Sequence, residues 1–549
     1  MKKIFSCVFI IILAVSSALH AGNRKAVLFM IDGLRSDAFF TSPTPNIDSI
    51  KDGTWAEGYK GAYSLHACPI PDAIPNSAPN HVAILTGVTA NKNGCYNNGE
   101  TAGADYEKYP PISALIKQTI PGLKSAWLYH WSEDQEIPTG ATYIAPPQGD
   151  QQVVDNAVAL LNGSFPTQKG IQGSVWTHGD DIDLLMLYID DCDGAGHTHR
   201  FSTTSPEYLA AVRVVDRQIG EILNAIRNRP NFKDEEWMIT LCADHGGIDH
   251  EHGVWNAPDS YTTPLLVSSK EVDNGTMRGD PRNLDAAAYI VKHFTGTVPE
   301  HFDAKINEVS APQTRSFADG LIAYFPFEGN IRPSVGNISG TSPADKLVYS
   351  ESGRVGQALS LTGTNPVCFG KPEPLQFGTT GDFTIALWIR TNMIQNGRAP
   401  IFGNKMQRKG IKLGDNPEPG VLLEGNIITY EYNNLSFSLG DSIHHHNINC
   451  LVYKPDSCWY LAAITFDHDG DACLYLGYPD GTLAFVAQRL CHFGNLNNLD
   501  WYLGQDGTGL AADPFVGDVD ELMIWNRSLT AEEINQLYQI GLNGESVLN

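Results

Sequence analysis

The sequence predicts an α/β fold, with a mostly parallel sheet that carries helices on both faces, followed by an all-β antiparallel sandwich of the jelly-roll kind. Two observations lead to this prediction. Between residues 25 and 296, short apolar runs alternate with helical stretches, which is typical of parallel strands joined by helices. After about residue 312, short strands of alternating polarity are separated by Gly, Asp and Asn turns. The length of 549 residues, with 42% apolar residues, leaves room for two or three such cores.

The chain begins with a segment, residues 1–21, that predicts a secretory signal peptide. Lys2 and Lys3 precede an apolar run at residues 4–19, and the segment ends in small residues with Ala21. The run is short for a spanning helix, which needs about 20 apolar residues, and the sequence contains no second run of that kind. We therefore expect a secreted protein, periplasmic or extracellular, without a membrane span.

An odd number of cysteines, nine, follows this segment. In an oxidising compartment some of them can pair, and Cys68–Cys95 and Cys450–Cys458 are candidate pairs that lie near one another in sequence. Because the number is odd, at least one thiol is expected to be free or intermolecular.

The first domain, placed at residues 22–310, has four clear buried strands, at residues 26–31, 126–129, 184–189 and 238–242. A long helix is predicted between the last two, at residues 205–228. Ser205 can cap its first turn, and Pro206 suits the first helical position. Its apolar residues fall on one face, so we expect this helix to pack against the sheet and to carry no chemistry.

Residues 311–317 are predicted to form a linker, and residues 318–549 the second domain. Within that domain, residues 383–390 alternate in a way that predicts a strand with one face in the core and the other outside. Near the end, Thr530 and Glu533 have the spacing of a capping box, which predicts a short closing helix.

The charge balance argues against one class of function. The chain has 37 basic and 62 acidic residues, a formal net charge of −25. A protein that binds nucleic acid by neutralising phosphates carries charge of the opposite sign, so we expect no stable nucleic-acid binding.

Side chains of the metal-binding type follow three of the predicted strands where each strand ends. They are Asp32 after the first strand, Asp190, Asp191, Asp193 and His197 after the third, and Asp244, His245, His250 and His252 after the fourth. A single Asp-Gly after a strand is also just a turn. Because the carboxyl ends of parallel strands open on one edge of a sheet, however, we expect these side chains to converge.

Carboxylates and imidazoles without clustered thiolates suit zinc, with manganese or iron as alternatives. Four to six such ligands exceed what one tetrahedral ion needs. We therefore expect two divalent ions about 4 Å apart, a pair that clamps the attacking and leaving oxygens of a displacement at phosphorus. Ser77, flanked by Pro75 and Pro79 at a helix start, is the candidate nucleophile. A plain helix cap is the alternative role for a serine at such a position.

These motifs resemble those of the alkaline phosphatase superfamily, and within it the type I phosphodiesterase and nucleotide pyrophosphatase branch, which adjoins the sulfatases. The resemblance covers about residues 25–296 and implies an alkaline phosphatase-like fold and a metal-dependent phosphoric ester hydrolase. Five motifs carry it, in this order: Ile31-Asp32-Gly33-Leu34-Arg35, Thr44-Pro45-Asn46-Ile47-Asp48, Ser77-Ala78-Pro79-Asn80-His81 through Thr86-Gly87, Asp193-Gly194-Ala195-Gly196-His197, and Ala243-Asp244-His245-Gly246-Gly247 with His252-Gly253.

The resemblance assigns two sets of metal ligands. One metal is held by Asp32, Asp244 and His245 and shared with Ser77, which becomes phosphorylated. The other is held by Asp193, His197 and His252, and it activates the water that releases phosphate. His252 is preferred to His250 because it precedes a glycine, and His250 and His199 then lie outside the ligand set.

The resemblance also bears on substrate recognition. Asn98, with Asn97 as the alternative, is placed to donate a hydrogen bond to the phosphoryl oxygen. Sulfatases need an arginine four residues after their formylglycine, whereas His81 stands there in this chain, so formylglycine at Ser77 is not expected. Serine replaces the threonine that is usual in this branch and is its chemical equivalent.

The second domain resembles laminin-G-like, concanavalin A-like sandwiches. The resemblance rests on residues 320–327, 353–359, 383–388, 514–521 and 529–534. It implies a carbohydrate ligand, and a domain that only packs against the enzyme is the alternative. A calcium site is a further expectation, with turn formation as the alternative role of its acidic residues, Asp518, Asp520 and Glu521.

The leading hypothesis is a secreted two-metal hydrolase of small-molecule or glycan-linked phosphate esters, such as phosphodiesters or nucleotide-like pyrophosphates, acting through a phosphoserine on Ser77. One alternative is sulfate or phosphonate ester hydrolysis on the same metals. An alternative of another class is a glycan-binding surface adhesion protein with an inactive first domain. The complete set of ligands argues against decay, because ligands buried without a cation carry a desolvation cost.

Overall fold

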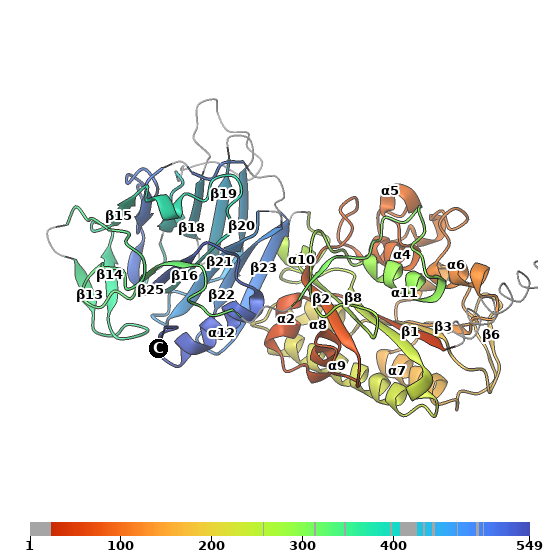
Figure 1. Ribbon diagram of the computed structural model, residues 1–549. Coiled ribbons are helices and arrows are strands. Elements are labelled where there is room, and N and C mark those ends of the chain that lie inside the picture. Colours follow the sequence, from red (N-terminus) through yellow and green to blue (C-terminus); the bar gives the residue numbers. More distant parts are fainter. Residues whose placement is uncertain are drawn as a thin grey trace, which may run out of the picture. The chain divides into compact units, whose positions relative to one another are not determined.

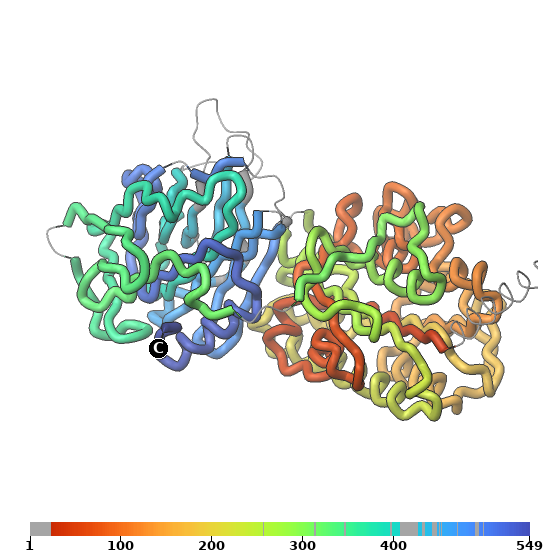
Figure 2. Tube along the Cα trace, viewed as in Figure 1, coloured from red at the N-terminus to blue at the C-terminus, as the bar shows by residue number. Residues whose placement is uncertain are grey.

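The computed structural model describes residues 23–548, except 256, 312–314, 345–346, 396–397, 407–424, 432–433, 442–444, 469, 490–493 and 498. The signal peptide predicted at residues 1–21 lies outside the described residues. The chain forms two compact units, Met1–Pro312 and Gln313–Asn549 (Figure 2). Each unit has its own layers of secondary structure, which are labelled in Figure 1.

A nine-stranded sheet forms the centre of the first unit. Its strands are β1 (Arg24–Ile31), β2 (Lys60–Ala67), β3 (Ser125–Leu128), β4 (Tyr143–Ile144), β7 (Leu184–Ile189), β8 (Glu236–Ala243), β9 (Thr263–Ser269), β10 (Gly275–Met277) and β11 (Val309–Ser310). Their order across the sheet is β11-β10-β2-β9-β8-β1-β7-β3-β4. Neighbouring strands pair in parallel, except that β9 and β11 run antiparallel to their neighbours. A separate two-stranded sheet contains β5 (Gln168–Lys169) and β6 (Val175–Trp176).

The three central strands, β8, β1 and β7, are buried along almost their whole length. Strands that are covered on both faces read as continuous apolar runs, because neither face needs polar side chains. The strands predicted at residues 26–31, 184–189 and 238–242 are therefore confirmed, and the run at residues 126–129 corresponds to β3.

Helices lie on both faces of this sheet, as Figure 1 shows. In the described part of the first unit they are α2 (Ser36–Thr41), α3 (Pro45–Lys51), α4 (Ser77–Thr86), α5 (Ala90–Asn93), α6 (Ile112–Thr119), α7 (Asp150–Leu161), α8 (Asp191–His199), α9 (Pro206–Arg227), α10 (Pro258–Tyr261) and α11 (Asp285–Thr295), with 3₁₀ turns η1 (Thr101–Gly103), η2 (Ser132–Glu136) and η3 (Phe232–Asp234). Helices α4, α6 and α11 share one apolar core with the even-numbered residues of β1 and β7. Helices α7, α8 and α9 lie on the other face.

The long helix predicted at residues 205–228 is confirmed as α9. The Ser205 hydroxyl accepts a hydrogen bond from the Tyr208 amide at 3.3 Å, and Pro206 is the first helical residue. The apolar side chains from Val212 to Ile226 are buried along one face. The prediction succeeds because cap, proline and periodicity all point to the same boundaries.

The second unit is a sandwich of two antiparallel sheets, as predicted. One sheet has the order β13-β14-β25-β16-β21-β22-β23, with β12 also paired to β25, and the other has the order β15-β24-β17-β18-β19-β20. The side chains between them form one apolar core. The elements are β12 (Leu321–Phe325), β13 (Val348–Ser350), β14 (Ala358–Thr362), β15 (Val367–Gly370), η4 (Glu373–Leu375), β16 (Phe383–Arg390), β17 (Arg398–Gly403), β18 (Gly425–Glu431), β19 (Asn434–Gly440), β20 (His445–Val452), β21 (Tyr460–Phe466), β22 (Asp471–Gly477), β23 (Leu483–Arg489), β24 (Trp501–Leu503), β25 (Val516–Trp525) and α12 (Ala531–Leu542).

The alternation predicted for residues 383–390 is confirmed, because the odd-numbered residues of β16 belong to the core between the two sheets and the even-numbered ones do not. The outer face is not open to solvent, however, since the first seven residues of β16 are all buried. The outer side is covered because the ring of Trp388 stacks on Tyr538 of α12, with 6.0 Å between ring centroids, and the Arg354 guanidinium lies 4.8 Å from the Trp388 ring. Helix α12 itself begins with the predicted capping box of Thr530 and Glu533.

The cysteine pairs suggested by the sequence are not formed, because neither Cys95 nor Cys458 belongs to a disulfide. The thiols face backbone carbonyls instead: Cys68 Sγ lies 3.7 Å from His66 O, and Cys95 Sγ lies 3.8 Å from Asn97 O. Among the residues that the structure describes, no helix has both the length and the apolar character needed to span a bilayer.

Candidate metal centre and nucleophile

The expected ligands come from the ends of the three adjacent central strands. Asp32 follows β1, Asp193 lies in the first turn of α8 just after β7, and Asp244 and His245 follow β8. Because β8, β1 and β7 are neighbours and run parallel, these side chains meet at one edge of the sheet.

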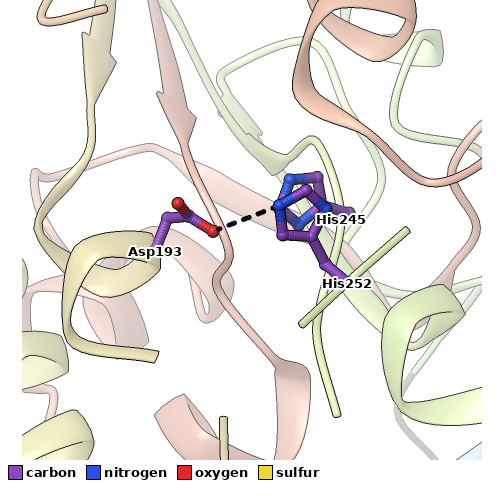
Figure 3. A group of neighbouring side chains, drawn as sticks. All are labelled: Asp193, His245 and His252. Atoms are coloured by element: carbon purple, nitrogen blue, oxygen red, sulfur yellow. Dashed lines mark ion pairs between the residues drawn. The ribbon is translucent and has the colours of Figure 1, made fainter. Parts of the chain in front are cut away.

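Three overlapping groups of side chains there could hold a cation. They are Asp193 with His245 and His252, Asp32 with His81 and Asp244, and Asp32 with Asp190 and Asp193, and in each group one ligand atom per residue lies within 4.8 Å of the others. Figure 3 shows the carboxylate of Asp193 facing the rings of His245 and His252, which are stacked at 3.8 Å.

The imidazole of His245 lies at the centre of the cluster. Its Nε2 atom is 3.2 Å from Asp32 Oδ1 and 3.2 Å from Asp244 Oδ2. His252 Nε2 lies 3.9 Å from Asp193 Oδ1, and His197 Nε2 lies 3.3 Å from Asp193 Oδ2. The structure thus brings all six expected side-chain ligands other than Ser77 to one place, with His197 at its more exposed rim.

Each of the three expected histidine ligands is oriented by a backbone carbonyl. The Nδ1–H group donates to Gly246 O in His245, to Pro75 O in His252 and to His250 O in His197, at 2.7 to 3.0 Å. A carbonyl only accepts, so Nδ1 carries the proton and the Nε2 lone pair is presented to the cluster. This is the arrangement found in histidines that bind metal ions.

Ser77 is the first residue of α4, and its hydroxyl oxygen lies 3.2 Å from His245 Nε2. The helix start is fixed by Asn98, whose Oδ1 accepts from the Ala78 amide at 3.0 Å. Asn97 Oδ1 accepts from the side chain of Asn76 at 2.8 Å. Both asparagines named from the sequence therefore lie beside the first turn of α4, and Asn98 is hydrogen-bonded to Ala78, the residue after Ser77.

Burial and mutual repulsion shape the electrostatics of the cluster. Burial, together with neighbouring carboxylates, raises the pKa of Asp32 well above its usual value and raises the pKa of Asp193 to about 8. Burial also lowers the pKa of His252 to about 3 and lowers the pKa of His245. For Asp244, burial is outweighed by His245 and His81, so its pKa is lowered.

These features fit divalent cations. Asp32 Oδ1 and Asp193 Oδ1 are buried and have no hydrogen-bond partner among the described residues, although each faces the cluster. Carboxylate oxygens and neutral imidazole nitrogens are the donors that zinc and similar ions take. A cation would satisfy both orphaned oxygens and relieve the repulsion that raises the two carboxyl pKa values.

Several residues of the site were not identified as such from the sequence. His81 Nε2 lies 3.2 Å from Asp244 Oδ2, and His81 Nδ1 lies 3.0 Å from Asp134 Oδ1. Although burial opposes it, Asp134 and Asp244 raise the pKa of His81 to about 10. The Tyr188 hydroxyl lies 2.5 Å from Asp32 Oδ2 and 2.8 Å from Asp190 Oδ1. The spacing of His81 four residues after Ser77 is a helical signal that could have placed it on the same face.

The aromatic side chains near the site in sequence differ in their exposure. Tyr143 is fully buried, and Trp131 lies edge-on to the ring of His81 at 5.9 Å. Two exposed aromatic side chains are Tyr96, 44% exposed, and Trp255, 53% exposed. In sequence they lie two residues from Asn98 and three residues from His252, respectively.

The acidic side chains proposed for calcium have protein partners. Asp518 pairs with Arg390 at 2.5 Å, and Asp520 accepts from the amides of Arg354, Val355 and Glu521. They form no three-residue cation cluster within the described part of the chain. The second unit therefore gives no support for calcium at these residues.

Two segments of the chain are similar to known protein families. Residues 26–258 match the family described as type I phosphodiesterase / nucleotide pyrophosphatase, and residues 361–535 match the concanavalin A-like lectin/glucanases superfamily. The chain is 23% identical to human ectonucleotide pyrophosphatase/phosphodiesterase family member 7 over 41% of this chain and 48% of the relative. It is 24% identical to GPI ethanolamine phosphate transferase 1 of Aspergillus oryzae over 49% and 27%.

A third relative is venom phosphodiesterase of Macrovipera lebetinus, 26% identical over 40% of this chain and 25% of that protein. The chain thus spans about a quarter to a half of the length of these curated relatives. The matched segment contains all the ligands and the nucleophile described above. Over residues 26–258 the chain is therefore similar to type I phosphodiesterases / nucleotide pyrophosphatases, and over residues 361–535 it is similar to the concanavalin A-like superfamily.

Proposed function

We propose that this protein is a secreted two-metal hydrolase of phosphate esters, which acts on phosphodiesters or nucleotide pyrophosphate-like substrates through a covalent phosphoserine on Ser77. One observation carries the proposal: the Ser77 hydroxyl stands at the start of a helix, 3.2 Å from His245 Nε2, within a buried cluster of carboxylates and imidazoles. The match of residues 26–258 to a phosphodiesterase family supports the reaction class.

Two cation sites account for the donors. Asp32, Ser77, Asp244 and His245 would hold one ion, and Asp193, His197 and His252 would hold the other, with zinc as the ion best suited to this set. His245 lies between the two groups, which would place the ions close together. Bound ions would supply Lewis-acid stabilisation of the charge on the phosphoryl oxygens.

The residues of the chain provide the rest of the reaction. The Ser77 hydroxyl releases its proton to solvent as its oxygen attacks phosphorus and the O–P bond forms. The bond from phosphorus to the leaving oxygen breaks, and that oxygen takes up a proton from solvent. Water then attacks the phosphoserine, breaks its O–P bond and restores Ser77. Ser77 begins α4, so the amides of the first helical turn favour the negative charge that develops there. Asn98 Oδ1 accepts from the Ala78 amide, and the side-chain NH₂ group of Asn98 would donate to the same phosphoryl oxygens.

The second unit supports a further part of the proposal. Its superfamily contains lectins and glucanases, which favours a carbohydrate ligand. Retention of the full mature chain on immobilised polysaccharides tests this, because release by free sugar is expected of a lectin-like surface and passage without delay would contradict it. Export is tested by N-terminal sequencing of the secreted protein, which should begin after Ala21.

The central experiment combines metal analysis with substrate turnover by the purified mature chain. We expect two divalent ions per chain and hydrolysis of nitrophenyl phosphodiester or monoester. Turnover of nitrophenyl sulfate alone would overturn the choice of phosphate. Acid quenching during turnover should trap phosphate on the peptide that contains Ser77.

A variant pair tests the nucleophile. Ser77→Ala should lower turnover roughly a thousandfold or more, because the nucleophile and its partners act as a unit. Ser113→Ala is the matched control, since Ser113 is also a buried serine in the first turn of a helix, α6, and bonds only to Ser125. Similar turnover by Ser77→Ala and Ser113→Ala would remove the assignment of Ser77.

A further inference from the structure

A buried histidine–aspartate pair lies against the cluster and has no part in the proposed reaction. His81 and Asp134 are both 0% exposed, and His81 Nδ1 lies 3.0 Å from Asp134 Oδ1. On its other side, His81 Nε2 lies 3.2 Å from Asp244 Oδ2. The three side chains form a continuous chain of contacts that ends on an expected metal ligand.

We propose that His81 and Asp134 are positioning residues, which fix the carboxylate of Asp244 for the cation site that it shares with Asp32. This inference rests on the metal centre of the proposed function. Asp134 orients the ring of His81, and His81 in turn holds one oxygen of Asp244. Neither residue has to touch substrate to act in this way.

The contacts of Asp244 show what the pair adds. Oδ1 of Asp244 is held from two directions, by the amides of Gly33 at 3.1 Å and His245 at 2.9 Å. Oδ2 has no backbone donor in the described structure and instead faces His81 Nε2 and His245 Nε2, each at 3.2 Å. Because His245 Nδ1 carries the proton and its Nε2 presents a lone pair, His81 is the side chain that can donate to Oδ2.

The ring of His81 is itself firmly held. Besides the bond to Asp134, it packs against Tyr188 at 4.6 Å and against the edge of Trp131 at 5.9 Å. Loss of a side chain that holds a metal ligand in this way usually lowers metal affinity by about 10- to 100-fold.

The pair also joins two elements of the site. His81 lies four residues after Ser77, so both project from the same face of α4. Asp134 lies in η2 and Asp244 follows β8, so the contact of His81 with Asp244 ties the helix that carries the nucleophile to the end of a central strand. The distance between the hydroxyl of Ser77 and the Asp32–Asp244 site therefore depends on this link.

Metal affinity is the readout that separates this role from a purely structural one. The full mature chain, loaded with zinc, is dialysed against a graded series of a zinc chelator, and bound zinc per folded protein is measured. The variants are Asp134→Ala, Asp134→Asn, His81→Leu and His81→Gln. Glu136→Gln is the matched control, since Glu136 is an exposed acid in the same 3₁₀ turn and does not contact His81.

We expect Asp134→Ala and His81→Leu to lose one of the two ions at a chelator concentration about 10- to 100-fold lower than the one at which wild type loses it. Both variants should keep the other ion. Asp134→Asn keeps an acceptor for Nδ1–H and His81→Gln keeps a donor, so both should lie between these variants and wild type. Glu136→Gln should match wild type.

Equal zinc retention by wild type, Asp134→Ala and His81→Leu would overturn the inference while leaving the metal centre intact. Loss of both ions together would also overturn it, because the role is assigned to one site. A wild type that binds no zinc would instead overturn the proposed function. If the alanine and leucine variants do not fold, zinc retention by Asp134→Asn and His81→Gln is compared with that of Glu136→Gln. Lower retention by the first two supports the inference, and equal retention overturns it.

Discussion

Replacement of Gly33 by alanine tests whether the turn after β1 sets the geometry of the whole centre. Gly33 has φ +65°, and its amide donates to Asp244 Oδ1 at 3.1 Å. A Cβ atom there would lie 2.9 Å from Asp193 Cα and 2.9 Å from Phe201 Cε1. The left-handed backbone costs about 1–2 kcal/mol for a residue with a side chain. Relief of the two close contacts costs about 1–3 kcal/mol more and moves Asp193.

We therefore expect Gly33→Ala to lower the free energy of unfolding by about 2–5 kcal/mol in total. A ligand displaced by a fraction of an ångström should lower kcat/KM for a nitrophenyl phosphate ester by about 10- to 100-fold. Gly58→Ala is the matched control, because Gly58 has φ +80° but nothing within 4 Å of its Cβ position. That control should lose only about 1–2 kcal/mol and keep full activity.

Urea unfolding gives the first quantity and steady-state kinetics the second. If Gly33→Ala and Gly58→Ala lose the same stability and keep the same kcat/KM, the close approach of Gly33 to Asp193 does not constrain the centre. The reasoning from contact distances would then be refuted.

Three further predictions concern other parts of the centre. Because the pKa of Asp193 is raised to about 8, its carboxyl group holds a proton below that pH in the metal-free protein, and a cation must displace this proton to bind. Zinc affinity, measured by titration in metal buffers, should therefore rise about fivefold from pH 7 to pH 8. Arg35→Met should lower the free energy of unfolding by about 3–5 kcal/mol in urea, because it leaves the buried carboxylates of Asp37 and Asp259 without their guanidinium partner. Trp255→Ala should change the free energy of unfolding by less than about 0.5 kcal/mol, because the ring is exposed. If the ring contacts the leaving group of an aromatic phosphodiester, the variant should have a higher KM for that substrate and an unchanged kcat. An unchanged KM would show that the ring makes no such contact.

Much of the first unit can be predicted because its signals are local. Strands β1, β7 and β8 are covered on both faces, so each appears in the sequence as an uninterrupted apolar run. Ser205 and Pro206 mark the start of α9 in the same way. Once these strands are known to be parallel neighbours, the convergence of Asp32, Asp193 and Asp244 follows from the strand ends alone.

The features that escape prediction depend on contacts between distant segments. Asp134 lies in a short 3₁₀ turn without a motif, and only the folded chain brings it within 3.0 Å of His81. The outer face of β16 looks exposed in the sequence because its cover, α12, lies about 140 residues further along. Proximity in sequence likewise suggested Cys68–Cys95, although the two thiols face different carbonyls.

The carbonyl groups of Gly246, Pro75 and His250 have a consequence for how the protein acquires its ions. They hold all three imidazoles in one tautomer before any ion arrives. Binding of an ion would then require no rearrangement of these rings, so the chain could fold first and bind metal afterwards. A site prepared in this way would accept several borderline cations, so the ion it binds would depend on which ions are available to the protein.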